Sequence, residues 1–239
     1  MTEQREYGAP VVNWTPPPAP GPSVIEGRYV RLERLDPAAH AADLHAANAA
    51  SDAIWDYLPY GPFTTVAEYE AWAREMAQLA DPYFYAIRDR ASGRACGVAS
   101  FLRIAPASGS IEVGHINFSP ALQRTPAATE AMYLMMGWAF EAGYRRYEWK
   151  CDSLNMPSRR AAQRLGLSYE GIFRQATVYK GRNRDTAWFA AIDKEWPGLR
   201  TAFETWLAPE NFDADGRQRQ SLSTLTRPHL AATDPAFPG

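Results

Sequence analysis

The residues best suited to bind an anion lie where a predicted strand gives way to a helix, between Phe118 and Glu130. The helix is predicted to begin at Pro126, with Thr125 as its N-cap. The first N–H groups of a helix have no partner within it and lie at the positive end of its dipole, so they bind phosphate well. An ordinary capped helix is the alternative interpretation. The groups that would contact an anion belong to Arg124, Thr125, Ala127, Ala128 and Thr129.

Two titratable side chains, Glu112 and His115, lie three residues apart on the strand predicted over 111–118. On a regular strand they would point to opposite faces of the sheet. Gly114 between them is a natural place for a β-bulge, which would change that arrangement. A histidine with a pKa near neutral can accept a proton through water. The simpler interpretation of His115 is a partly buried structural histidine.

Basic residues are concentrated in one region of the sequence. From Arg145 to Arg184 there are ten Lys or Arg residues against three Asp or Glu residues. Local positive charge would favour a phosphate ligand, an RNA or an acidic protein surface, and for most of these residues a solvated helix face is the simpler interpretation. The arginines expected near the anion site are Arg124, Arg159, Arg160 and Arg164.

Strands and helices alternate between residues 29 and 207, and they must position these groups. Period-two alternation predicts strands, and N-cap residues followed by apolar positions three or four apart predict helices. The predicted strands cover 29–35, 83–88, 95–104, 111–118, 147–151, 169–175 and 187–192, the last two joined by a loop over Lys180–Arg184. The predicted helices cover 37–50, 65–80, 126–142, 156–165 and 196–207. This mixture predicts one α/β or α+β domain over 24–207.

The two ends of the chain differ from this core. Residues 1–23 form a proline-rich extension that cannot be helical. Val11, Val12 and Trp14 are the residues that could hold it against the domain, and a free arm is the alternative. Residues 208–239 are polar and show no periodicity, so they are predicted to be a C-terminal tail.

The composition is that of a globular protein that needs neither disulfides nor a metal. Of 239 residues, 46% are hydrophobic and 22% charged, and the net charge of -2 makes nucleic acid an unexpected partner. Two cysteines, Cys96 and Cys151, are too few for a disulfide framework or a zinc site, and we expect a cytoplasmic protein. No apolar run approaches the roughly 20 residues that span a bilayer, so no membrane partner is expected. Met1–Gly8 has no secretion signal.

Several motifs, in sequence order, resemble the GNAT superfamily of acyl-CoA N-acyltransferases, and its RimJ/RimL-like branch in particular. Asn155-Met-Pro-Ser158, followed by Leu165-Gly-Leu167, resembles the Asn-x-x-Ser and Leu-Gly-Phe stretch of that family. The start at Gly27–Leu35 is typical of the branch. The resemblance extends from about Val24 to Pro197, and its further matches are Tyr169-Glu-Gly171, Arg174 and Gly181–Asp185.

The phosphate loop departs from the superfamily pattern at one position. That pattern is Gln or Arg, two residues, Gly, one residue, then Gly or Ala, and Gln123–Ala128 matches it except that Pro126 replaces the first glycine. Proline is tolerated at the first position of a helix but removes one N–H. The amides of Ala127, Ala128 and Thr129 are expected to remain free for the ligand, and Gln123 joins the candidate cofactor contacts by resemblance.

The resemblance implies a mixed, mostly antiparallel sheet flanked by helices, with splayed strands at the cofactor site. It implies acetyl-CoA as cosubstrate, no metal, and direct attack of a primary amine on the thioester in a ternary complex. Ser158 would then protonate the leaving thiolate, or simply cap a helix, and Asn155 would contact the pantetheine arm or cap. Glu112, His115 or a chain of waters would take the proton from the amine. Nothing marks Cys151, near the expected channel, as a reactive thiolate.

The acceptor is left open by the sequence. An acceptor pocket is expected from the first two helices, the last hairpin and the aromatic loop over 55–63, although those aromatic residues could equally be core. The acceptor is a protein N-terminus or a small-molecule amine, and a homodimer is a family-level expectation. A non-catalytic acyl-CoA-binding protein and an RNA- or ribosome-associated module are the alternatives. The candidate acceptor contacts are Trp55, Asp56, Tyr57 and Tyr60, with Phe63 as a further wall.

Overall fold

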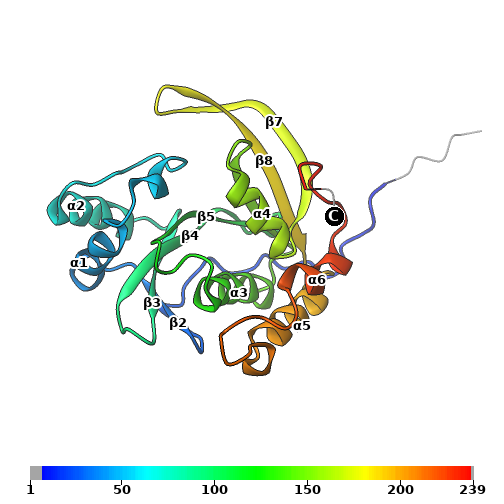
Figure 1. Cartoon of the computed structure of the whole chain (residues 1–239). Coiled ribbons are helices and arrows are strands. Elements are labelled where there is room, and N and C mark those ends of the chain that lie inside the picture. Colours follow the sequence, from blue (N-terminus) through cyan, green and yellow to red (C-terminus); the bar gives the residue numbers. More distant parts are fainter. Residues whose placement is uncertain (1–6, 238–239) are drawn as a thin grey trace, which may run out of the picture.

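The computed structural model describes residues 7–237 and arranges eight strands in one sheet (Figure 1). The sheet order is β1-β2-β3-β4-β5-β6-β8-β7, and every neighbouring pair among these strands is antiparallel except β5 and β6. This confirms the predicted mixed, mostly antiparallel sheet. The strands are β1 (Val24–Glu26), β2 (Val30–Arg34), β3 (Tyr83–Asp89), β4 (Ala95–Ala105), β5 (Ser110–Phe118), β6 (Arg146–Asp152), β7 (Ser168–Tyr179) and β8 (Arg182–Ile192).

Helices cover the sheet on both faces (Figure 1). On one face, two helices form a small aromatic core against β3 and β4. On the other, four helices and the inner side chains of β2 to β8 form the larger core. The first group is α1 (Pro37–Asn48) and α2 (Val66–Ala77), which a short 3-10 helix η1 (Asp52–Trp55) connects, and the second is α3 (Pro126–Glu141), α4 (Met156–Arg164), α5 (Trp196–Leu207) and α6 (Leu222–Thr226).

The helices begin where the capping signals predicted. Asp36 caps α1 by accepting a hydrogen bond from the Ala38 N–H. The side chains and backbone amides of Thr65 and Glu68 form a reciprocal capping box at the start of α2. Because caps depend on residues within one turn, these starts could be derived from local sequence alone.

The hairpin of β7 and β8 is longer than predicted. The loop expected over Lys180–Arg184 shrinks to a two-residue turn, because residues 182–184 pair in β8 with residues 177–179 of β7. Its outer half projects beyond the helical layers (Figure 1) and exposes side chains such as Phe173 and Val178. Exposed strand residues show no apolar alternation. The predicted strand for β7 therefore ended too early, and the predicted strand for β8 began too late.

The proline-rich extension lies against the domain over part of its length. The indole of Trp14 packs on Gly109 and donates a hydrogen bond to the carbonyl oxygen of Ala107, 3.2 Å away. Further along, the hydroxyls of Tyr144 and Tyr85 donate to the carbonyl oxygens of Pro18 and Pro22. Val11 and Val12 are exposed. Trp14 and the later prolines therefore hold the arm, and the two valines do not.

The segment after Leu207 is packed onto the domain, although the sequence predicted a tail there. The side chains of Leu222, Thr226 and Asp234 are fully buried. The packed part of the chain thus extends to about residue 237. Polar composition suggested a tail because the buried groups here are held by ion pairs and hydrogen bonds, which no hydrophobic period reveals.

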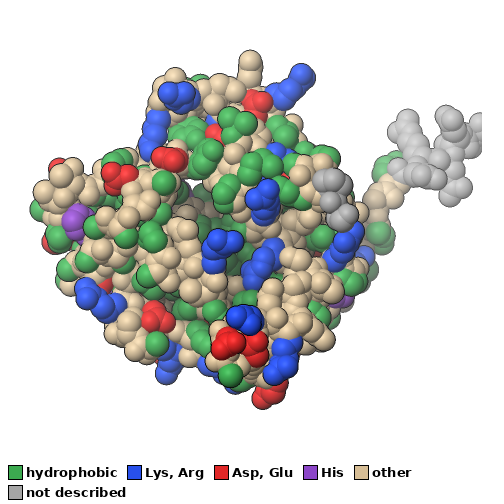
Figure 2. Space-filling model, in the orientation of Figure 1, with side chains coloured by type: hydrophobic (Ala, Val, Ile, Leu, Met, Phe, Trp, Pro, Cys, Tyr) green, Lys and Arg blue, Asp and Glu red, His purple; other side chains and the backbone are tan. Residues whose placement is uncertain are grey.

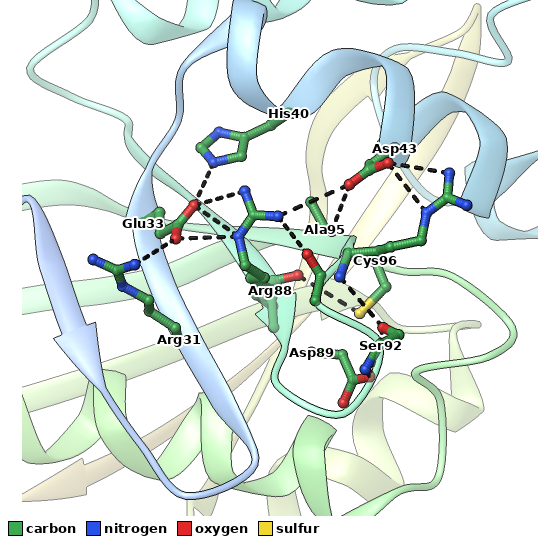
Figure 3. Close-up of polar contacts among 12 residues, drawn as sticks. Arg31, Glu33, His40, Asp43, Arg88, Asp89, Ser92, Ala95 and Cys96 are labelled. Atoms are coloured by element: carbon green, nitrogen blue, oxygen red, sulfur yellow. Dashed lines mark hydrogen bonds and ion pairs between the residues drawn. The ribbon is translucent and has the colours of Figure 1, made fainter.

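A cluster of charged side chains joins α1 to the sheet (Figure 3). Glu33 on β2 accepts hydrogen bonds from Arg88 on β3 at 3.0 and 3.1 Å, and its Oε2 lies 2.6 Å from Nε2 of the buried His40. The Asp36 N–H donates to Nδ1 of His40, so Nε2 is the ring nitrogen that donates to Glu33. Burial by itself raises the pKa of Glu33, but the bonds from Arg88 and His40 outweigh it and hold the pKa below 4.5.

Replacing Arg88 with methionine is expected to lower the free energy of unfolding by about 2 kcal/mol near pH 7, because Glu33 loses its main partner. A carboxylate with a lowered pKa contributes stability above its unfolded pKa, and that stability is lost as pH falls through the folded pKa. The difference between wild type and Arg88→Met should therefore shrink from about pH 7 to about pH 3. Urea titrations at both pH values test this, and an unchanged difference would contradict it.

Candidate active site

The strands β5 and β6 separate in the middle of the sheet. They pair in parallel from Ser110 and Arg146 to Val113 and Trp149, and no pairing between them follows within residues 7–237. Beyond that point, β5 leads into α3 and β6 leads into α4. The predicted splayed strands are thus present, and the starts of two helices flank the opening. Figure 2 shows a recess on this face, bordered by Lys and Arg side chains, where Figure 1 has β5 and α4.

A β-bulge interrupts β5 just after its last pair with β6, Val113 and Trp149. Ser100 on β4 lies opposite Gly114, whereas Val98 lies opposite Asn117, so His115 and Ile116 together face one residue of β4. The bulged His115 has a positive φ of 49°. The predicted bulge is present, one residue after Gly114. It puts His115 among the aromatic rings of the α1–α2 core.

Glu112 is a buried carboxylate held by two cations. Its side chain is 3% exposed, with Oε1 2.7 Å from Arg103 Nη1 and Oε2 2.9 Å from Lys150 Nζ. Burial raises its pKa above the usual carboxylate value, while Lys150 and Arg103 oppose that rise. The Lys150 ammonium also pairs with Glu148 at 2.7 Å and lies over the Trp188 ring. A carboxylate with a raised pKa is a better proton acceptor than an ordinary one.

His115 lies between two aromatic rings. Its imidazole stacks on Tyr60 with a centroid distance of 5.6 Å and an interplanar angle of 12°, and it contacts Phe84 at 5.2 Å. Burial, followed by the charges of Arg103 and Arg184, lowers the pKa of His115 to about 4. The ring is therefore neutral near pH 7. The fold thus brings together His115, predicted as a candidate base, and Tyr60, predicted as a candidate acceptor contact.

The start of α3 supplies free amides, but not the set expected. The hydroxyl of Thr125 accepts the Ala128 N–H at 3.1 Å, so the cap occupies that amide. The amides of Arg124, Thr125 and Ala127 find no acceptor among residues 7–237. Arg124 has a φ of 62°, a left-handed conformation in the turn that leads into α3. These three amides can therefore hold an anion.

Two other predicted ligands of this loop bind protein groups. The side-chain amide of Gln123 donates to the Phe118 carbonyl oxygen at 2.9 Å and so braces the turn. The hydroxyl of Thr129 accepts a hydrogen bond from Arg164 at 3.2 Å. Both residues therefore shape the loop, and Thr129 links α3 to α4.

The start of α4 lies across the opening. The Oδ1 atom of Asn155 accepts the Ser158 N–H at 3.1 Å, so Asn155 is the helix cap and the Ser158 hydroxyl is not needed for capping. That hydroxyl accepts a hydrogen bond from the Trp149 indole at 3.0 Å, which leaves its own O–H free to donate. Burial raises the pKa of the neighbouring Cys151 thiol to about 11, so this cysteine is a neutral thiol.

The aromatic loop after α1 is partly core and partly a bridge. Trp55 is buried and contacts Phe63, with ring centroids 5.4 Å apart. Tyr57 donates its hydroxyl to the Leu154 carbonyl oxygen beside α4, and Lys180 on the hairpin turn donates to the Trp55 carbonyl oxygen at 2.8 Å. Asp56 is exposed. The loop, the hairpin and the β6–α4 turn thus meet above the opening.

Comparison with known proteins identifies the family. The sequence profile of the acetyltransferase (GNAT) domain matches residues 30–168. A GCN5-related N-acetyltransferase from Brucella melitensis is 48% identical, with 91% of this chain and 100% of that chain covered and a TM-score of 0.89. This chain belongs to the GNAT family. A GNAT-family acetyltransferase from Chromobacterium violaceum ATCC 12472 is 40% identical, with coverage of 82% and 100% and a TM-score of 0.76.

The more distant neighbours support the fold alone. RimL, the ribosomal L7/L12 alpha-N-protein acetyltransferase, is 23% identical, with 71% of this chain and 93% of that chain covered and a TM-score of 0.60. No curated protein matches this GNAT sequence. Within residues 7–237, no helix is long and apolar enough to cross a membrane, and no three His, Cys, Asp or Glu side chains form a metal-binding group.

Sequence reasoning missed the cations that hold Glu112. Arg146, Glu148 and Lys150 alternate with apolar residues along β6, so their side chains share one face of the sheet. That alternation was the available signal for a charged row beside Glu112. This charged row also accounts for part of the basic region over Arg145–Arg184, because Arg146 and Lys150 are bound to carboxylates.

Proposed function

We propose that this GNAT protein transfers the acetyl group of acetyl-CoA to a primary amine by direct attack in a ternary complex. The observation that carries the proposal is the opening between β5 and β6, which the starts of α3 and α4 flank and the Glu112 carboxylate adjoins. Amides at one edge suit a diphosphate, and a buried carboxylate suits deprotonation of an amine.

The donor side uses the two helix starts. The amides of Arg124, Thr125 and Ala127 would bind the diphosphate, and the side-chain N–H groups of Asn155 would bind the pantetheine arm. The separated part of β5 would offer a backbone amide to the thioester carbonyl oxygen as it gains charge. The O–H of Ser158 would protonate the sulfur when the carbon–sulfur bond breaks.

The acceptor side uses the face of β5 that carries Glu112. A carboxylate with a raised pKa takes the proton of the incoming amine through water while the new carbon–nitrogen bond forms. We assign the neutral His115 to the wall of the acceptor site with Tyr60, because its lowered pKa makes it the weaker base. A protein N-terminus and a small-molecule amine remain the two acceptor classes to be tested.

The basic region gives less support to an RNA-binding module. Arg159 is buried against Asp234, and the Arg164 guanidinium lies over the Trp206 ring. Charges that are already paired or stacked contribute little to phosphate binding.

An enzyme is distinguished from a protein that binds acetyl-CoA without turnover by measuring thiol release from acetyl-CoA in the presence of a panel of amines. Release with at least one amine supports the proposal, and binding without release contradicts it.

Replacing Pro126 with alanine is expected to tighten acetyl-CoA binding about threefold to tenfold, because one N–H is restored at the start of α3. Calorimetric titration of both proteins gives the two Kd values. Pro37→Ala is the matched control, since it makes the same exchange at the first position of α1, away from the start of α3, and should leave the Kd unchanged. An unchanged or weaker Kd for Pro126→Ala would argue against the diphosphate position.

A further inference from the structure

The C-terminal strap, residues 222–237, is attached to the middle and to the C-terminal end of α4. At the C-terminal end of α4, Thr226 donates its hydroxyl to the Arg164 carbonyl oxygen at 3.0 Å. Asp234 pairs with Arg159 in the middle of α4, and the backbone N–H of Asp234 donates to the side chain of Gln163, near the C-terminal end of the helix, at 2.6 Å. Figure 1 shows this segment, in red, beside α4 and the start of β7.

The ion pair of Arg159 and Asp234 is the central contact. Asp234 is fully buried and Arg159 is 6% exposed. The guanidinium binds the carboxylate in a bidentate manner, with distances of 2.8 and 2.6 Å. A third N–H of the same guanidinium donates to the Ser153 carbonyl oxygen at 2.8 Å. Arg159 therefore links the strap to the turn between β6 and α4, where Asn155 begins the helix.

The strap also pairs with the edge of the sheet that α4 covers. The Tyr169 N–H on β7 donates to the Ala232 carbonyl oxygen at 3.2 Å, and the Ala231 N–H donates to the Ser168 hydroxyl at 2.8 Å. These bonds fix the position of the strap relative to the residues of β7. Its contacts with α4 are thereby fixed relative to the sheet.

The helix α4 needs such support, because little of it is anchored by apolar packing. It has nine residues, and its buried side chains are Arg159 and Ala162. A helix this short is marginal by itself, so tertiary contacts must supply its stability. A bidentate, fully desolvated pair gives directional restraint, and loss of one partner leaves a buried charge without its counter-charge.

We propose that Arg159 and Asp234 are positioning residues for the acetyl donor, which act by holding Asn155 and Ser158 on α4 in place. The inference rests on the proposed function, because it takes Asn155 and Ser158 as donor contacts. The strap lies beyond the residues 30–168 that the family profile matches. Asp234 therefore lies outside the matched domain, whereas its partner Arg159 lies inside it. The acceptor side is built on α1, α2 and β5 and meets the β6–α4 turn at the hydrogen bond from Tyr57 to Leu154.

The test compares Asp234→Asn with Asp234→Glu and with Arg88→Met. We expect Asp234→Asn to raise KM for acetyl-CoA about tenfold and to lower kcat, with a smaller effect on KM for the amine. Asp234→Glu keeps the carboxylate and should recover at least part of both values. Arg88→Met loses stability on the face of the sheet opposite α4, so it should leave KM for acetyl-CoA unchanged. Wild-type kinetics in Asp234→Asn, or the same donor defect in Arg88→Met, would overturn the proposal.

Hydrogen exchange of the free protein separates this inference from the proposed function. Asp234→Asn should accelerate exchange of the α4 amides at least about tenfold relative to wild type, whereas Arg88→Met should not. If wild type releases no thiol with any amine, the proposed function fails, and exchange alone then decides whether the strap holds α4. Equal α4 exchange in wild type and Asp234→Asn overturns the strap's role whatever the activity.

Discussion

Replacing Glu112 with glutamine is expected to lower kcat/KM for the amine by at least about 100-fold, because general base catalysis contributes a factor of that order or more. The Kd for acetyl-CoA should change little, since the start of α3 is untouched. Glutamine keeps the size of the side chain, and Lys150 retains Glu148 as a partner. Steady-state kinetics with calorimetry measure both quantities, and unchanged kinetics would remove Glu112 from the mechanism.

The pH profile gives an independent check of the same role. The base must be ionised, so kcat/KM should fall as pH drops through the pKa of Glu112, which burial raises above the usual value of 4.5. Lys150→Met removes a charge that opposes this rise and should shift the acid limb to higher pH. His115→Phe should leave the limb in place, because His115 is assigned to the acceptor wall. A limb that disappears in His115→Phe would make His115 the base.

Replacing Glu130 with alanine is expected to produce the largest loss of stability, about 4 kcal/mol. The carboxylate on α3 is 5% exposed and accepts the N–H groups of Arg28, Tyr29 and Val30 at 2.8, 2.6 and 2.8 Å. Alanine would leave three donors of the β1–β2 turn without partners, and buried N–H groups rarely remain unpaired. Thermal unfolding should show Tm lowered by roughly 8–16 °C.

Glutamine at position 130 is the control, because it keeps one acceptor oxygen and nearly the same volume. Glu130→Gln should lose less stability than Glu130→Ala. Gly27 in the same turn packs so closely on Glu130 that a Cβ at this position would clash with the carboxylate. Equal Tm values for Glu130→Ala and wild type would show that this carboxylate does not hold the turn.

Local signals in the sequence predicted the helix starts, and the family resemblance implied the splayed strands, but neither revealed what holds them. Thr125 and Asp36 cap helices through groups one turn away, so the sequence nearby was sufficient. The carboxylate of Glu130 instead binds amides about 100 residues earlier in the chain, and Asp234 binds Arg159 from 75 residues away. No periodicity encodes such pairs, because their members become neighbours only after the fold has formed.

The candidate site shows the same division. The bulge near Gly114 and the start of α3 could be derived from residue types and spacing. The cations that surround Glu112 could not, because they depend on side-chain directions that only the packed strands determine.

The central claim, that this GNAT protein uses acetyl-CoA, is tested most directly by calorimetric titration of the purified protein with acetyl-CoA, with free CoA as comparison. The free amides at the start of α3 and the adjacent opening predict binding of both ligands at micromolar Kd, about 8 kcal/mol of binding free energy. Absence of binding at about 1 mM of either ligand would contradict the account of the site from α3 to α4.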